Sequence, residues 1–360
     1  MTMNFAGAGS AALYWLHSVG GSSRTVLEAT DRYTPASLIE ATGFTPERFT
    51  SGRVAKALAK HALGRARYLD DSYPLFGLGC TATIATDRTK RGQHRCAIAV
   101  KDALGMALYT LTLTKGKRTR KEEEELVSLV ILKAAAEACG VLYVPDLPLI
   151  GEEEVVHKYE AATKLEQLWQ GDIPYLLVGT DGKVQKTNDL SGVAILSGSF
   201  NPLHEGHRTL AKVAAERLGK PVYFELPLIN ADKDPIDLAE ARRRALQFAG
   251  TAPIILSRAP LFSDKAAFFP DSTFVLGADT AARLVAPRFY DNEDVEAALG
   301  QLSKHGAQFL VAGRSSKGEF TTLSDLAIPE GYRNMFAELP ESAFHMDISS
   351  TELREKQGQT

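Results

Sequence analysis

The sequence lacks several features that mark whole classes of proteins. Its 360 residues include three cysteines, Cys80, Cys96 and Cys139, which form no C-x-x-C pair and leave an odd number. Such a set argues against a disulfide framework or a cysteine zinc site, and it fits a reducing compartment. No apolar run reaches the roughly 18 residues of a membrane-spanning helix. The first residues have no basic segment typical of a signal peptide, so we expect a cytoplasmic protein without a membrane partner.

A strong excess of charge of either sign is also missing. Lysine and arginine number 41 against 44 aspartates and glutamates, which gives a net charge of -3. Without a global basic field we expect no nucleic-acid partner, and any anionic ligand must be held by a local site. Hydrophobic residues make up 44% and charged residues 24% of the chain, as in ordinary globular proteins. The chain is longer than a domain with a single hydrophobic core usually is, so we expect two domains.

Residues 1–150 are predicted to form a mixed α/β domain. The acidic run Glu122–Glu125 opens one of its helices, where negative charge favours the positive end of the helix dipole, and we interpret the run as a solvated first turn. The expected helices are 36–44, 51–69 and 118–140, and the expected strands lie within 75–86 and 95–114.

Residues 151–190 are predicted to be a linker that contains a hairpin, with Asp181-Gly182 as the turn. From residue 191 to 360, apolar strands alternate with amphipathic helices, which predicts an α/β domain with a Rossmann-like parallel sheet covered on both faces. Ligands of such sheets bind at the carboxyl ends of the strands. The expected strands are 192–198, 221–227, 252–258, 272–279 and 307–314, and the expected helices include 207–219 and 238–250.

The stretch "GSFNPLHEGH", Gly198 to His207, lies at the end of the first of these strands. Gly198 allows a tight turn and Pro202 stops the strand, so that a helix begins near the histidines. Free N–H groups and the dipole at that helix start favour a phosphate. His204 and His207 lie on one helix face and are suited to stabilise charge on a transferring phosphoryl group. The alternatives are surface histidines or a partial metal site, which would need a third ligand.

A second stretch, "DISSTELR", covers Asp347 to Arg354. Its Ser-Ser-Thr sequence is typical of a helix N-cap with hydroxyl donors. Arg354 follows on the first turns, where a guanidinium group can hold phosphate oxygens through two hydrogen bonds. Taken alone, the stretch is better explained by a plain capping box, with Ser349 or Ser350 as the cap and Glu352 nearby.

The two stretches together resemble the G-x-F-[DN]-P-x-H-x-G-H and I-S-S-T-x-[IL]-R motifs of HIGH-type nucleotidyltransferases, in the nicotinamide/nicotinate mononucleotide adenylyltransferase family. They occur in the family's order, about 140 residues apart. The resemblance implies transfer of AMP from ATP, with Mg2+, to nicotinamide or nicotinate mononucleotide, with release of pyrophosphate, as in NAD biosynthesis. It assigns catalytic roles to His204, His207 and Arg354. No nucleophilic side chain is needed, because catalysis is positioning plus charge stabilisation.

The same resemblance implies which residues bind the nucleotides. "GAD", Gly277 to Asp279, matches a G-[AS]-D stretch that contacts adenosine or the mononucleotide, although Asp279 also fits a plain helix cap. Lys233 matches a basic residue near the phosphates, with a surface lysine as the alternative. A tryptophan of the commonest bacterial forms is missing here, so stacking on the pyridine ring falls to Phe289 or Tyr290. The expected binding residues are Gly198, Ser199, Phe200, Lys233, Gly277, Asp279, Ser349, Ser350 and Thr351.

Residues Leu16 to Gly43, "LHSVGGSSRTVLEATDRYTPASLIEATG", are similar to the CinA C-terminal (nicotinamide-nucleotide amidohydrolase) family. The family's nucleophile lies in an S-C-T-G-G loop that corresponds here to Ala6–Ser10, with Ala6 at the position of the nucleophilic serine. The resemblance therefore implies a CinA-like fold without deamidase activity, and it suggests self-association into a homo-oligomer. The alternative is an unrelated α/β domain used for dimerisation.

Several functions remain open at the level of the sequence. Within the same superfamily, AMP or CMP could be transferred to another phosphate acceptor. A different class is a pyridine-nucleotide-binding protein that keeps the fold without turnover, but the intact His204, His207 and Arg354 argue against it. The sequence does not choose between the amide and the acid form of the mononucleotide.

Overall fold

The computed structural model describes residues 1–88, 91–141, 144–186, 189–229, 234–287, 294–316 and 319–344. The chain divides into two compact units. The N-terminal unit consists of Met1–Glu166, Thr180–Val184 and Leu246–Gly250, and the C-terminal unit consists of Gln167–Gly179, Gln185–Ala245 and Thr251–Thr360.

The described part of the N-terminal unit contains a six-stranded mixed sheet with the order β2-β1-β3-β4-β5-β6. β1 pairs in parallel with β2 and β3, whereas β3, β4, β5 and β6 follow one another in antiparallel register. The strands are β1 Thr2–Ala6, β2 Glu28–Asp31, β3 Gly77–Thr83, β4 His94–Lys101, β5 Gly105–Leu113 and β6 Val156–Ala161.

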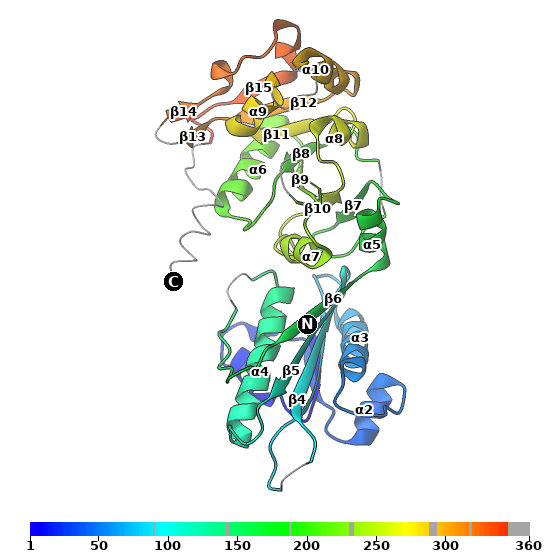
Figure 1. Cartoon of the computed structure of the whole chain (residues 1–360). Coiled ribbons are helices and arrows are strands. Elements are labelled where there is room, and N and C mark those ends of the chain that lie inside the picture. The colour runs from blue at the N-terminus through cyan, green and yellow to red at the C-terminus, as the bar shows by residue number, and fades with distance from the viewer. Residues whose placement is uncertain are drawn as a thin grey trace. The chain divides into compact units, whose positions relative to one another are not determined.

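Helices cover both faces of this sheet (Figure 1). On one face the small residues Ala55 and Ala59 of α3 pack against Ala97 and Ala99 of β4, and on the other face α4 closes the larger core. The approach of α3 is close, because a Cβ atom on Gly79 would lie 2.3 Å from the carbonyl oxygen of Ala55. The helices are α1 Ser10–His17, α2 Pro35–Thr42, α3 Gly52–Leu69 and α4 Arg120–Ala138.

The acidic run at the start of α4 is not a solvated turn, so the sequence prediction is wrong there. Glu122 forms a capping box with Thr119, but Glu123 is fully buried. Its carboxylate accepts hydrogen bonds from the backbone N–H of Ala85 at 2.7 Å and from His94 Nδ1 at 2.8 Å. The physical reason is helical spacing: Glu123 lies three and four positions before the buried Leu126 and Val127, on the face that contacts the sheet.

The C-terminal unit contains, among its described residues, a seven-stranded sheet with the order β15-β12-β11-β8-β9-β10-β7. All neighbouring strands are parallel except β10 and β7. This confirms the predicted α/β fold with a Rossmann-like parallel sheet. The strands are β7 Tyr175–Val178, β8 Ala194–Ser197, β9 Val222–Pro227, β10 Ile254–Ser257, β11 Thr273–Gly277, β12 Gln308–Ala312 and β15 Phe336–Leu339.

The strand order of this sheet reverses between β8 and β11. From β8 the chain proceeds outward through β9 and β10, and from β11 it proceeds outward in the other direction through β12 and β15. Crevices at such reversals are where open α/β sheets bind ligands. The flanking helices are α5 Thr163–Gln170, α6 Glu205–Leu218, α7 Leu238–Leu246, α8 Phe262–Phe268, α9 Ala278–Leu284 and α10 Val295–Lys304, and a small hairpin is formed by β13 Arg314–Ser316 and β14 Glu319–Thr321.

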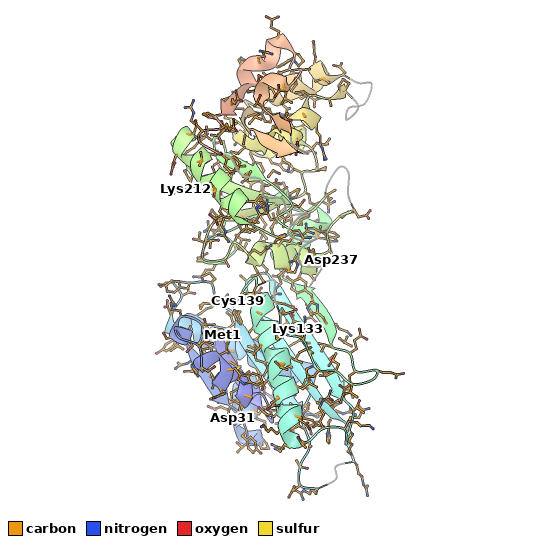
Figure 2. All side chains as sticks on the ribbon, turned by 90° about the vertical axis from the view of Figure 1, so that its left-hand side faces the viewer. Met1, Asp31, Lys133, Cys139, Lys212 and Asp237 are labelled. Carbon is orange, nitrogen blue, oxygen red and sulfur yellow. The ribbon has the colours of Figure 1, made fainter. Side chains whose placement is uncertain are left out.

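The stretch 151–190, predicted to be a linker, holds β6, α5 and β7 and so supplies one strand to each sheet. The predicted hairpin turn has Gly182 at φ +71°, and beyond it the N–H of Gln185 donates to the carbonyl oxygen of Leu177 at 2.9 Å. Cys80 and Cys96 are buried free thiols, and Cys139 is an exposed one at the end of α4 (Figure 2). Among the described residues, none of the helices combines the length and the apolar character needed to span a membrane.

Candidate active site

The loop between β8 and α6 starts with a glycine that the structure requires. The N–H of Gly198 donates to the carbonyl oxygen of Glu225 at 3.0 Å, and a Cβ atom at Gly198 would lie 2.8 Å from the ring of Phe200. Phe200 has φ +44° and is 1% exposed. Its ring packs edge-on against His207 and Phe224, with centroid distances of 5.1 and 5.5 Å. The ring therefore anchors the loop in the interior.

The two motif histidines lie together at the start of α6. His204 is the N-cap residue, and its backbone N–H donates to Nδ1 of His207 at 3.3 Å. The two rings stack with centroids 3.7 Å apart and planes inclined by 26°. Because Nδ1 of His207 accepts a hydrogen bond, the neutral imidazole carries its proton on Nε2. The motif thus places two half-buried imidazoles at a helix start, where negative charge is favoured.

Two arginines of α7 also hold this loop in place. Arg244 donates to the carbonyl oxygen of Ser199 at 3.1 Å, and Arg243 donates to Oδ1 of Asn201 at 2.7 Å. Glu240, on the same helix, accepts from both guanidinium groups at 2.6 and 2.7 Å. Burial raises the pKa of Glu240, but the hydrogen bonds and positive charges of the two arginines outweigh it and hold the pKa below its usual range.

A buried polar cluster next to the loop joins three neighbouring strands to α8. Lys265 of α8 is 3% exposed, and its Nζ lies 2.6 Å from Oε2 of the fully buried Glu225 and 2.7 Å from Oγ of Ser197. The hydroxyls of Ser197 and Ser257 both donate to the Glu225 carboxylate. Ser197 ends β8, Glu225 belongs to β9 and Ser257 ends β10. Since Ser197 directly precedes Gly198, this cluster, which we call the buried lysine cluster, fixes the point at which the loop leaves the sheet.

Sequence reasoning missed both supports of the loop. The signal for the α7 contacts was the run of three arginines, Arg242–Arg244, in a helix that follows the second parallel strand. The signal for the buried lysine cluster was Glu225 itself, a charged residue in the middle of an apolar strand. Such a buried charge needs a partner, but nothing in the local sequence indicates that the partner is Lys265, 40 residues away.

The stretch Gly277 to Asp279 lies at the same edge of the sheet. β11 pairs with β8, with Val275 opposite Leu196, so that the carboxyl ends of both strands meet there. Gly277 is the N-cap of α9, and a Cβ atom built on it would have no neighbour within 4 Å, so this position faces open space. The half-buried Asp279 lies in the first turn of α9.

The structure thus gathers Gly198, Ser199, the two histidines, Gly277 and Asp279 at one edge of the sheet. Within the described residues, no three His, Cys, Asp or Glu side chains are arranged to hold a metal ion. The remaining predicted residues lie outside the described residues: Lys233, Phe289, Tyr290, Ser349, Ser350, Thr351 and Arg354.

In the N-terminal unit, the loop matched to the amidohydrolase nucleophile is occupied by a carboxylate of the chain itself. Glu124 of α4 accepts hydrogen bonds from the backbone N–H of Gly9 at 2.8 Å, the hydroxyl of Ser10 at 2.9 Å and the backbone N–H of Ala11 at 3.2 Å. Ala6, at the position of the nucleophile, is buried and has no functional group. The start of α1 is therefore filled by an internal anion, and the absence of deamidase activity stays a prediction.

Comparison with known proteins bears on the C-terminal unit. Residues 195–356 match the family model described as cytidylyltransferase-like. This range begins in β8 and includes His204, His207 and Arg354, so the region that carries the candidate site is similar to nucleotidyltransferases. No curated protein matches the chain. The identity of the transferred nucleotide, the acceptor and the CinA-like character of the N-terminal unit remain predictions.

Proposed function

We propose that the C-terminal unit transfers AMP from Mg-ATP to nicotinamide or nicotinate mononucleotide and releases pyrophosphate. The observation that carries this proposal is the stacked pair of His204 and His207 at the start of α6, directly after the strand at which the sheet order reverses. The family match supports nucleotidyl transfer as the class of reaction. The choice of ATP and of a pyridine mononucleotide rests on the resemblance of "GSFNPLHEGH" and "DISSTELR" to the adenylyltransferase motifs.

In the proposed reaction, a phosphate oxygen of the mononucleotide attacks the α-phosphorus of ATP. The bond from the α-phosphorus to the bridging oxygen breaks, and pyrophosphate leaves with that oxygen. His207 donates from Nε2 to a phosphate oxygen, and the start of α6 adds its positive dipole end. This displacement proceeds without a covalent intermediate on the protein. The protein therefore contributes by orienting the substrates and by stabilising the developing negative charge.

Mg2+ enters this scheme as part of the nucleotide substrate. ATP binds the ion through its own phosphate oxygens, and Mg2+ commonly keeps several waters while contacting few protein groups. The described part of the site offers the imidazoles of His204 and His207 and the guanidinium groups of Arg243 and Arg244 as hydrogen-bond donors.

A second candidate is cytidylyl transfer from Mg-CTP to another phosphate acceptor. The observation that favours it is the family description itself, which is cytidylyltransferase-like. The two candidates share the site and the chemistry at the α-phosphorus, and they differ in the base and in the acceptor.

The test is to incubate the full chain with Mg-ATP or Mg-CTP and each acceptor, and to follow pyrophosphate and product separately. We expect a dinucleotide from ATP with one or both pyridine mononucleotides. Turnover only with CTP would select the second candidate. Binding of mononucleotide without pyrophosphate release from either nucleotide would contradict both and indicate a binding protein.

A matched pair of variants connects the activity to the histidines. His207→Ala is expected to lower kcat by roughly 10²- to 10³-fold, as when one donor to a developing oxyanion is lost. His305→Ala, at the C-cap of α10 in the same unit, removes an exposed imidazole and should leave kcat unchanged. Equal activity of the His207→Ala variant and the unaltered protein would remove this side chain from the mechanism.

A further inference from the structure

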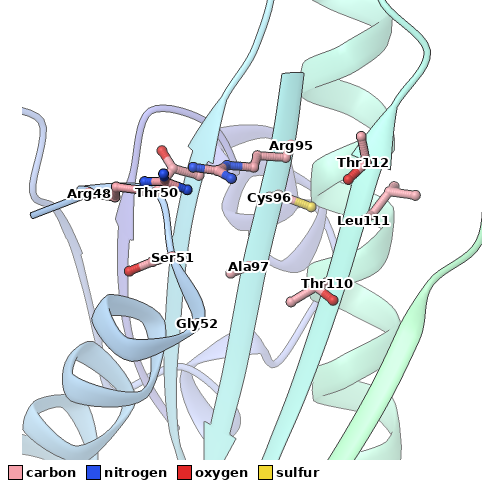
Figure 3. A pocket seen from close by; sticks show the side chains of 10 residues that line it. All are labelled: Arg48, Thr50, Ser51, Gly52, Arg95, Cys96, Ala97, Thr110, Leu111 and Thr112. Atoms are coloured by element: carbon pink, nitrogen blue, oxygen red, sulfur yellow. The ribbon is translucent and has the colours of Figure 1, made fainter. Parts of the chain in front are cut away.

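The N-terminal unit contains a pocket that the proposed transferase reaction does not use. Its volume is about 320 Å³, and it lies where the loop before α3 meets the face of β4 and β5 (Figure 3). The loop contributes Arg48, Thr50 and Ser51, and the strands contribute Arg95, Thr110 and Thr112.

The two arginines extend toward each other across the pocket, as Figure 3 shows. Arg48 is exposed and Arg95 is half-buried. Within the described residues, neither guanidinium group has an ion-pair or hydrogen-bond partner. Two like charges that converge without a counter-ion repel each other, and the least costly way to offset that repulsion is an anion bound between them.

The register of the sheet places the polar groups on one face. Arg95 lies opposite Thr112, and Ala97 lies opposite Thr110, so these side chains share the face that the loop covers. The methyl group of Ala97 fills little of the space between Arg95 and the first turn of α3. The pocket is therefore a consequence of a small residue placed between larger polar ones.

The loop that carries Arg48 is fixed to the sheet rather than free. The hydroxyl of the buried Thr81 donates to the carbonyl oxygen of Phe49 at 2.8 Å. Ser51 caps α3 and accepts from the backbone N–H of Val54 at 3.4 Å. Gly52 then brings α3 against β5, since a Cβ atom there would lie 2.9 Å from Leu108. The positions of the two arginines are thus largely set before any ligand binds, which lowers the entropic cost of binding.

The groups around the pocket are those that bind a tetrahedral dianion. Two guanidinium forks, threonine hydroxyls and the positive end of an 18-residue helix all supply hydrogen-bond donors. The thiol of Cys96, which also borders the pocket, is 2% exposed, and burial raises its pKa to about 12, so it is not a reactive thiolate. The arrangement is therefore suited to binding an anion.

We propose that this pocket is a binding site for the phosphate group of a small molecule. The neighbouring surface restricts the size of that molecule, because a second pocket, which shares Thr110 and Thr112, is lined by Glu152 and Glu154. These carboxylates repel an extended polyanion such as a nucleic acid. A single phosphate group is small enough to bind next to the two arginines without approaching the carboxylates. The site is independent of the transferase site, since all its residues belong to the N-terminal unit.

The test is calorimetric titration of the full chain with inorganic phosphate, using variants that remove one guanidinium group each. Arg48→Gln and Arg95→Gln are each expected to weaken phosphate binding roughly 10- to 100-fold, the range for loss of a charge-assisted hydrogen bond. Arg53→Gln is the matched control, because Arg53 lies in the first turn of α3, next to the pocket residue Gly52, but its guanidinium group stacks on the ring of Phe44 at 4.2 Å. Its phosphate affinity should equal that of the unaltered chain.

Three outcomes would overturn the proposal. Undiminished phosphate binding by both pocket variants would exclude the site, and an equal loss in the Arg53→Gln variant would show that only diffuse positive charge is involved. Loss of the phosphate signal in the His207→Ala variant would assign it to the C-terminal unit instead. Because Arg48 is exposed, its variant is expected to melt at the same temperature as the unaltered chain, which keeps the test independent of folding.

Discussion

Lys265→Met tests whether the buried lysine cluster stabilises the C-terminal unit. In the structure, Lys265 is 3% exposed, Glu225 is fully buried, and the ammonium and carboxylate groups are 2.6 Å apart. Removing one partner of a buried pair leaves the other charge uncompensated and typically costs about 3–5 kcal/mol. Methionine keeps most of the volume of the lysine side chain, so little of the loss should come from a cavity.

The assay is urea unfolding followed by the fluorescence of Trp169. The chain has two tryptophans, Trp15 in α1 and Trp169 in α5, so a Trp15→Phe background leaves a reporter of the C-terminal unit alone. With a slope of about 1–3 kcal/mol per molar urea, a loss of about 3–5 kcal/mol lowers the midpoint by at least roughly 1 M.

The double variant Glu225→Leu with Lys265→Met separates charge from packing. If the loss in Lys265→Met comes from the uncompensated carboxylate, removing that carboxylate as well should restore much of the stability, since buried pairs can be replaced by apolar residues at little net cost. An unchanged midpoint for Lys265→Met would refute the stabilising role of the pair. A double variant less stable than the single one would refute the reasoning about the uncompensated charge.

The remaining predictions concern other parts of the chain. Gly198→Ala should destabilise the C-terminal unit by about 1–3 kcal/mol in the same urea assay, because the new Cβ lies 2.8 Å from the ring of Phe200; no loss would contradict this packing. Glu153→Gln should lower the unfolding temperature more at pH 7 than at pH 2: hydrogen bonds from Arg118 lower the pKa of Glu153 from 4.5 to about 2, so its stabilisation is present above pH 4.5 and is lost as the pH falls toward 2. A loss independent of pH would contradict that ion pair. Because Ala6 has no nucleophile, nicotinamide mononucleotide should release no ammonia in a coupled assay, and ammonia release would refute the match at Ala6.

The sequence predicted the fold best where strands are buried on both faces. β8, β9, β10, β11 and β12 were all expected, because their continuous apolar runs between helical patterns are typical of a covered parallel sheet. β6 was not expected: "VHKYEA" lies at the edge of its sheet with mostly exposed side chains, so hydrophobic periodicity gives no signal. β1 and β15 were missed as well; in β15 only the first and last residues, Phe336 and Leu339, are buried, which is neither an alternating pattern nor a continuous apolar run.

For the candidate site, local patterns predicted local geometry and nothing more. The spacing of His204 and His207, together with the glycine and proline before them, predicts that both lie at the start of a helix. In the structure His204 is the N-cap of α6 and His207 lies in its first turn. The contacts of Arg243 and Arg244 join residues 42 and 45 positions apart, so they depend on the tertiary fold. The same is true of Lys265, which contacts Ser197 across 68 positions.

These long-range contacts matter because the proposed chemistry depends on positioning. The loop from Gly198 to Leu203 is anchored at its start by the buried lysine cluster and in its middle by the ring of Phe200, and Arg243 and Arg244 donate hydrogen bonds to it. A reaction without a covalent intermediate gains its rate from donors that already point at the developing charge, and displacement by about 1 Å can cost roughly a hundredfold. In the proposed reaction, the residues that hold this loop therefore determine how well the two histidines can act, and Lys265→Met should lower kcat more than it raises KM.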